Sequence, residues 1–111
     1  MSKLRQREDG AWTLLFGGAN IESVTWEGDS YAILHLGDHG EISMALPARV
    51  EIGGLIREAA FADDGVLMVA LKDGTVLESR CDAAVENWEV RGLDGLFVVA
   101  VAAEDSVAVW E

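Results

Sequence analysis

The stretch Ile33-Leu34-His35-Leu36-Gly37-Asp38-His39-Gly40-Glu41-Ile42-Ser43-Met44-Ala45-Leu46 carries the pattern that decides the fold. From Glu41 to Leu46, polar and small side chains alternate with Ile42, Met44 and Leu46, as in a strand with one buried and one wet face. The pair His39-Gly40 separates this run from the apolar run before it and marks a turn, because glycine accepts the backbone angles of tight turns. The stretch therefore predicts an antiparallel hairpin.

The same punctuation recurs along the whole chain. Runs rich in Val, Ile, Leu, Trp and Tyr are separated by glycine-containing pairs: Asp9-Gly10, Gly17-Gly18, Gly28-Asp29, Gly53-Gly54, Asp64-Gly65, Asp73-Gly74 and Asp94-Gly95. This spacing predicts short strands joined by hairpins and leaves little room for helix. The exceptions are one helical turn at Asp82–Asn87, with Asp82 as a candidate N-cap, and a weaker candidate at Pro47–Ile52.

An internal repeat emerges when the sequence is shifted by thirty-five positions against itself. The shift matches Ile21 with Ile56, Trp26 with Phe61, Asp29 with Asp64, Leu34 with Val69, Leu36 with Leu71, and Asp38 with Asp73. One deletion in the following turn then aligns Gly40 with Gly74 and Ile42 with Val76. Two copies, at about residues 20–46 and 55–79, are too few for a solenoid and predict pseudo-symmetric halves of one domain.

Further strands are expected on either side of the two units. Residues 12–16 form an apolar run before them, and three apolar runs at about residues 87–110 look like closing strands. The prediction is a single all-β domain over residues 1–111, with nine or ten strands and at most one short helix. Its architecture is an antiparallel two-sheet sandwich or a partly open barrel.

Two runs are apolar without alternation, Val66 to Leu71 and Leu96 to Val101. Such strands are expected to be buried on both faces. The second face would be covered by the edge of the other sheet, by the short helical segment or by a second copy of the protein, so a homodimer is possible. Trp26 and Phe61 are predicted to lie in the core.

Charge narrows the choice of partner. The net charge is −12, and three of the eight basic residues lie in the first seven positions, which leaves five basic against twenty acidic residues from Glu8 onward. Nucleic-acid binding is disfavoured, because that affinity comes mainly from Lys and Arg on phosphates. The charge favours a basic protein partner; alternatively, it only keeps a small apolar domain soluble.

Cys81 is the only cysteine, so an intramolecular disulfide framework is excluded. The first nine residues carry charge with no apolar region after them, and no apolar run is long enough to span a bilayer. The expectation is a cytoplasmic protein with no membrane contact.

The residues with chemical potential form no recognisable catalytic, metal or cofactor site. His35 and His39 flank Asp38, but His35 lies in a predicted strand and His39 in the next turn, and a metal site needs further ligands. Cys81, between Arg80 and Asp82, would need an imidazole in contact to act as a nucleophile. We expect no catalytic residue, no metal and no cofactor.

The last third of the chain resembles a known family. Trp88-Glu89-Val90-Arg91-Gly92-Leu93-Asp94-Gly95, an apolar strand and the ending Ala108-Val109-Trp110 are similar to an uncharacterised, mostly actinomycete family of small all-β domains of unknown function. The resemblance covers about residues 12–110, although Ala102–Asp105 replaces a usual Pro-Gly-Gly-like turn. It implies no catalytic residue and an association with contact-dependent immunity or other binding proteins.

These observations predict a non-enzymatic acidic binding module, possibly an immunity-type or inhibitor protein that neutralises a basic partner. The contact is expected at Glu27, Asp29, Asp63 and Asp64, because the repeat gives these acidic turns equivalent positions at one end of the sheets. Trp12 is the candidate exposed aromatic anchor. The alternatives are a structural or oligomerising subunit without a ligand, and a Cys- or His-dependent enzyme.

Overall fold

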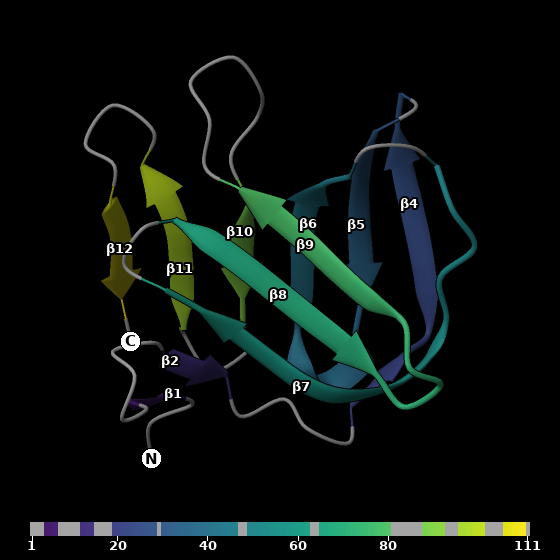
Figure 1. The fold of residues 1–111 in the computed structure, drawn as a ribbon, viewed down its shortest axis with the longest axis horizontal. Helices are drawn as coiled ribbons and strands as arrows, with labels where there is room; N and C mark the ends of the chain where they lie inside the picture. Colours follow the sequence, from purple (N-terminus) through teal and green to yellow (C-terminus); the bar gives the residue numbers. More distant parts are fainter. Residues whose placement is uncertain are drawn as a thin grey trace.

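The computed structural model describes residues 4–6, 12–14, 19–28, 30–46, 49–62, 65–80, 88–92, 96–101 and 106–110. These residues form twelve strands and one 3-10 turn. All strand pairs are antiparallel, and they form two separate sheets, one crossing in front of the other in Figure 1.

The front sheet has the strand order β1-β2-β7-β8-β9, with β3 also paired to β7. Its strands are β1 (Leu4–Gln6), β2 (Trp12–Leu14), β3 (Asn20–Ile21), β7 (Gly54–Phe61), β8 (Val66–Leu71) and β9 (Val76–Arg80). The back sheet has the order β12-β11-β10-β6-β5-β4. Its strands are β4 (Ser23–Glu27), β5 (Tyr31–His35), β6 (Glu41–Ala45), β10 (Glu89–Arg91), β11 (Phe97–Val101) and β12 (Ser106–Trp110).

The all-β, two-sheet prediction is confirmed, and of its two forms the sandwich is the one observed. Neither sheet closes on itself. The helical element of the described chain is the 3-10 turn η1 (Gly37–His39), whereas residues 49–53 are irregular, so the weaker helix candidate is wrong there. The stronger candidate, residues 82–87, lies outside the described residues. In the described part, no helix has the length and apolar character needed to cross a membrane.

The two predicted units form two three-stranded meanders with the same pairing register. Leu34 lies opposite Val24 on one side and Ile42 on the other. Thirty-five positions later, Val69 lies between Ala59 and Leu77 in the same way. The following turns also match, because the N–H of Leu36 donates to the carbonyl of Gly40 and that of Leu71 to Thr75, both at 2.8 Å.

The deletion placed in the sequence alignment is therefore wrong. It set Val76 against Ile42, but the structure puts Leu77 in that position. Ile42 is fully buried and Leu77 is 5% exposed, whereas Val76 is 53% exposed. A slip of one residue moves a strand's side chains to the opposite face, and matching Gly40 with Gly74 produced that slip.

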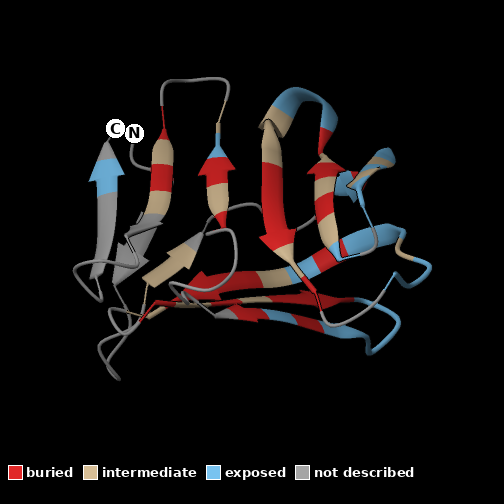
Figure 2. Ribbon diagram, turned by 90° about the horizontal axis from the view of Figure 1, so that it is seen from above, coloured by how far each residue is buried: buried red, intermediate tan, exposed pale blue. Residues whose placement is uncertain are grey.

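The core lies between the sheets and is one continuous cluster. Its members come from the inward faces of both meanders and of the closing strands, among them Ile21, Leu34, Ile42, Met44, Ile56, Val69, Leu71, Val90 and Val98. In Figure 2, buried residues alternate with half-buried ones along β5, whereas the centre of β6 is buried throughout. Phe61 is in this core as predicted, whereas Trp26 is half-buried at its margin.

The outward faces differ from expectation in β6, in β8 and in β11, where Phe97 and Val99 are half-buried although Leu96 and Val98 are buried. Ser43, on the predicted wet face of β6, is 5% exposed, because β6 lies in the middle of the back sheet between β5 and β10. In β8, Val66 and Met68 are half-buried between buried neighbours, so burial on both faces holds only at its end, Ala70 and Leu71. The homodimer inferred from full burial stays a prediction.

Trp88 ties the two sheets together. It directly precedes β10 of the back sheet and is fully buried. Its indole Nε1–H donates to the carbonyl of Gly65, between β7 and β8 of the front sheet, at 2.8 Å. Its ring centroid lies 5.7 Å from that of Phe61, with the rings tilted by 45°. One side chain therefore fixes the distance and the orientation of the two layers.

Replacing Trp88 with Phe keeps an aromatic ring but removes the donor. We expect Trp88→Phe to lower the free energy of unfolding by about 1–3 kcal/mol, because the buried Gly65 carbonyl is left without its partner. Denaturant unfolding measures this. The control is Trp26→Phe at a half-buried site, where the loss of the Arg49 contact to the ring should cost less than about 1 kcal/mol. Equal costs at the two positions would contradict the role given to the indole N–H.

The β8–β9 turn supplies a prediction about pH. The N–H of Thr75 donates to the Asp73 carboxylate at 2.8 Å, and this bond lowers the pKa of Asp73 below its usual 3.8. A carboxyl with a lowered native pKa stabilises the fold above its unfolded pKa, and that contribution disappears as pH falls through the native pKa. The stability difference between the wild type and Asp73→Asn should therefore be constant near neutral pH and shrink only below about pH 3.8. NMR titration of the Asp73 carboxyl checks this, and a midpoint at or above 3.8 would refute it.

Candidate functional site

A pocket of about 660 Å³ opens on the outer face of the back sheet, at the end where η1 lies. Strands β5, β6, β10 and β11 each contribute to it near one end, and Glu22 contributes from just before β4. Its lining residues are Glu22, His35, Gly37, Gly40, Glu41, Arg91, Gly92, Leu96 and Phe97. The pocket therefore combines two carboxylates, an imidazole, a guanidinium and an apolar wall.

Strand register brings four of these side chains into one row. His35 on β5 is paired with Glu41 on β6, and Glu41 is paired in turn with Arg91 on β10. Arg91 is paired with Phe97 on β11. Residues paired in this way lie on the same face of a sheet, about 5 Å apart between neighbouring strands. The row is therefore a direct consequence of the strand order of the back sheet.

Two glycines shape the pocket floor. Gly40 has a φ of 112°, and a Cβ at this position would lie 1.9 Å from the carbonyl oxygen of Arg91. Its lack of a side chain allows the start of β6 to approach the end of β10. Gly37 has a φ of 58°, and a Cβ there would lie 2.5 Å from the carboxylate of Glu22. The two glycines thus hold Glu22 and Arg91 close to the backbone of the turn.

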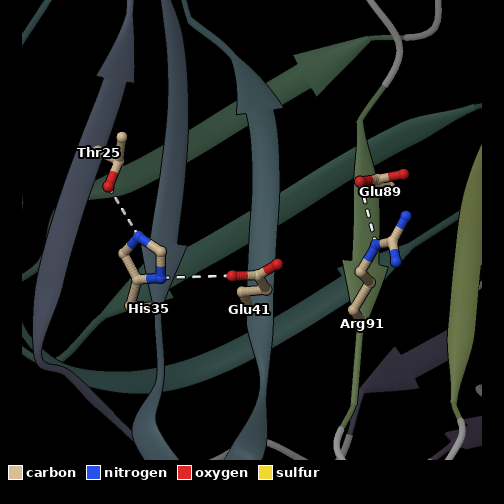
Figure 3. Close-up of polar contacts among 5 residues, drawn as sticks. All are labelled: Thr25, His35, Glu41, Glu89 and Arg91. Atoms are coloured by element: carbon tan, nitrogen blue, oxygen red, sulfur yellow. Dashed lines mark hydrogen bonds and ion pairs between the residues drawn. The ribbon is translucent and has the colours of Figure 1, made fainter.

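His35 is held from both sides. Its Nδ1 lies 3.3 Å from Glu41 Oε2, and its Nε2 lies 2.8 Å from Thr25 Oγ1 (Figure 3). Because a carboxylate only accepts, the hydrogen-bond network assigns the proton of the neutral ring to Nδ1, and Nε2 then accepts from the Thr25 hydroxyl. The side chains of His35 and Glu41 are 36% and 40% exposed, so the pair is open to a ligand.

Arg91 is also fixed in place. Its Nε lies 3.3 Å from Glu89 Oε1, and its guanidinium carbon lies 4.8 Å from the centroid of the Phe97 ring. Figure 3 shows the guanidinium turned toward Glu89 and not toward Glu41. Within the described residues, neither Nη of Arg91 has a hydrogen-bond partner, and the side chain is 57% exposed. Arg91 thus presents two nitrogens to solvent in a fixed orientation.

The charged groups that line the pocket are able to recognise a charged ligand. Thr25, His35 and Glu41 stand in the hydroxyl–imidazole–carboxylate order of nucleophilic triads. Thr25, however, is exposed on the sheet face and does not line the pocket, so its hydroxyl orients the imidazole. Among the described residues, no group of three His, Cys, Asp or Glu side chains is placed to hold a metal. A ligand would meet the carboxylates of Glu22 and Glu41 on one side and Arg91 on the other.

Of the four acidic residues predicted as a contact surface, the structure describes Glu27, so their grouping stays a prediction. Glu27 is exposed at the end of β4. Asp29, Asp63 and Asp64 lie outside the described residues. The ends of β4 and β7 are far apart in Figure 1. The repeat places the β4–β5 and β7–β8 connections in two different sheets.

The other singled-out residues are placed as follows. Trp12 is half-buried, packs against the core and pairs with Phe61, so the expectation of a freely exposed aromatic residue is wrong. His39 lies in η1, as expected for a turn residue. Cys81 lies outside the described residues, so the structure does not show how it stands relative to the imidazoles.

The site residues that sequence reasoning missed are Glu22, Thr25, Glu41, Glu89, Arg91 and Phe97. For Glu41 a signal was present, because His35 and Glu41 flank the turn 36–40 symmetrically and a hairpin centred on that turn must pair them. For Arg91, no pattern in the neighbouring sequence pointed to a place in the site. Arg91 reaches the pocket only because β10 pairs with β6, more than forty residues earlier in the chain.

Two open antiparallel sheets, with a mixed-charge pocket on one outer face, define this molecule as a small β-sandwich protein. A family model described as "Family of unknown function (DUF6188)" matches residues 38–111, and the chain belongs to this family. No curated protein and no solved structure shows significant similarity to the chain. The matched region includes Glu41, Glu89 and Arg91, whereas Thr25 and His35 precede it.

The pocket floor can be tested through Gly40. We expect Gly40→Ala to lower the free energy of unfolding by about 1–3 kcal/mol through the collision of the new methyl group with the Arg91 backbone. The total loss should be larger, because the alanine must also keep a left-handed conformation. Denaturant unfolding measures the change. Gly74→Ala, also at positive φ but with no atom within 4 Å of the added Cβ, isolates the backbone strain. If Gly40→Ala cost no more than Gly74→Ala, the close approach to Arg91 would be refuted.

Proposed function

We propose that this protein is a non-enzymatic acidic binding module that holds a basic segment of a protein partner, in the manner of an immunity-type or inhibitor protein. The observation that carries the proposal is the pocket in which Glu22 and Glu41 face solvent together. Its one guanidinium, that of Arg91, contacts Glu89 through Nε and is turned away from Glu41. A lysine or arginine side chain of a partner would find two carboxylates within one cavity.

The charge of the whole chain supports the same partner. A net charge of −12 attracts a cationic protein over several ångströms and speeds encounter, whereas contacts inside a pocket slow dissociation. Asp38, exposed in η1 beside the pocket, adds to the local negative field. Long-range steering is thus separate from the close contacts at Glu22 and Glu41.

The pocket is also prepared for binding. Glu41 is positioned by His35, which is itself held by Thr25, and the carboxylate of Glu22 lies against Gly37. Groups fixed in advance lose little side-chain entropy when a ligand binds, which raises affinity without new contacts. We propose that this binding takes place in the cytoplasm, in keeping with the single cysteine of the sequence.

The proposal is tested by affinity capture with matched charge variants. The immobilised wild type, a Glu22→Gln/Glu41→Gln variant and a Glu27→Gln/Glu51→Gln variant are exposed to a lysate of the source cell at low and high salt. We expect basic proteins to be retained by the wild type and released at high salt, since salt screens exposed charges. For a captured protein that is then purified, Kd should rise at least about tenfold in the pocket variant.

The control variant removes the same number of charges outside the pocket, at two exposed positions. It should keep the partner with Kd within about twofold of the wild type, because its effect is limited to weak surface electrostatics. If both variants lose the partner equally, the charge acts only as a diffuse field and the pocket is not the site. If only neutral or acidic proteins are retained, the proposed partner class is wrong.

A further inference from the structure

We infer that the pocket recognises a C-terminal basic residue of the partner, with the terminal carboxylate on Arg91 and the side-chain cation between Glu22 and Glu41. This inference rests on the proposed function and adds the chemical identity of the segment that enters the pocket. It is carried by one feature that a pocket for cations alone does not require, which is an oriented guanidinium on the wall of an acidic pocket.

Arg91 has the properties of a carboxylate receptor. Glu89 occupies its Nε and the Phe97 ring lies against its plane, so the guanidinium is oriented before any ligand arrives. Its two Nη groups have no partner within the described part of the chain. A guanidinium offers its N–H groups in a planar fork that matches the two oxygens of a carboxylate, and such bidentate bonds are among the strongest in proteins.

The opposite side of the pocket has the complementary charge. Glu41 is paired with His35 through one oxygen, which leaves Oε1 for a ligand, and the exposed carboxylate of Glu22 lies over Gly37. A ligand with only a carboxylate would be repelled by the carboxylates of Glu22 and Glu41. A ligand with only a cation would be repelled by the guanidinium of Arg91. The arrangement therefore favours a ligand that carries both charges in one residue.

Spacing supports a residue with a long side chain. Glu41 and Arg91 are on adjacent strands, about 5 Å apart at the backbone, and the Arg91 guanidinium leans further away toward Phe97. Lysine separates its ammonium from its own carboxylate by a four-carbon stem, which can span the distance between Arg91 on β10 and Glu41 on β6. Only the last residue of a chain brings a free carboxylate and a cationic side chain together in this way.

The experiment titrates three peptides into the 15N-labelled full chain, followed by backbone amide shifts. The peptides are acetyl-Gly-Gly-Lys with a free C-terminus, the same peptide as its C-terminal amide, and acetyl-Gly-Gly-norleucine with a free C-terminus. We expect the free-acid lysine peptide to shift Gly37, Gly40 and Gly92 in a saturable way. Amidation and norleucine should each raise Kd at least about tenfold, because each removes charge-assisted hydrogen bonds.

Variants of the protein test which residue binds the carboxylate of the peptide and which binds its cation. Arg91→Gln should weaken the free-acid peptide at least about tenfold and leave the amide unchanged, whereas Glu41→Gln should weaken both lysine peptides. Arg91→Lys keeps the charge without the fork and should fall between Arg91→Gln and the wild type. Arg57→Gln, which removes an exposed cation on β7 of the front sheet, is the matched control and should change nothing.

Equal binding of the acid and the amide, confined to the pocket, would overturn the C-terminal assignment and leave the proposed basic partner intact. Absence of saturable binding by either lysine peptide, or shifts spread over the whole acidic surface, would overturn this inference as well. In that case the capture experiment on whole proteins still tests the proposed function separately. Because the amide comparison uses the unmodified chain, it decides the question even if Arg91→Gln does not fold.

Discussion

The hydrogen bond from the Trp88 indole to the Gly65 carbonyl is the constraint on which the relation of the two sheets depends. It joins the start of β10 in the back sheet to the β7–β8 connection of the front sheet, inside a region closed to water. A buried carbonyl requires a partner, so the two layers cannot slide without losing this bond. With β10 fixed against the core, the side chains of Glu89 and Arg91 are directed to the opposite, outer face.

The candidate site is a product of that placement. β10 completes the back sheet between β6 and β11, and the row His35, Glu41, Arg91 and Phe97 exists only when all three neighbouring pairings form. Half of the row is local, because β5 and β6 are joined by the short turn containing η1. The other half, Arg91 and Phe97, joins the row because β10 pairs with β6, which lies far from it in the sequence. A site assembled in this way is sensitive to the packing of the core, although none of its ionic groups lies in the core.

Charge and geometry act at different ranges in this molecule. The excess of acidic residues is a property of composition and produces a field that any cation senses. The pocket selects among cations, because two carboxylates and one oriented guanidinium stand in fixed positions. Because the field is diffuse and recognition is local to the pocket, equivalent acidic turns in the two meanders need not form one surface. They add to the field, while recognition is concentrated where side chains from four strands meet.

The sequence alone determined the all-β class, the hairpins and the correspondence of the two meanders, because alternation and glycine-containing turns act over a few residues. It also contained the His35–Glu41 pairing, which follows from the turn between them. Only the tertiary structure decided that the equivalent turns lie in different sheets, that Trp12 is half-buried, that Ser43 is covered and that Arg91 faces the pocket. Each of these depends on which strands become neighbours across long stretches of chain, and that choice is made by packing of the whole core, which no local pattern encodes.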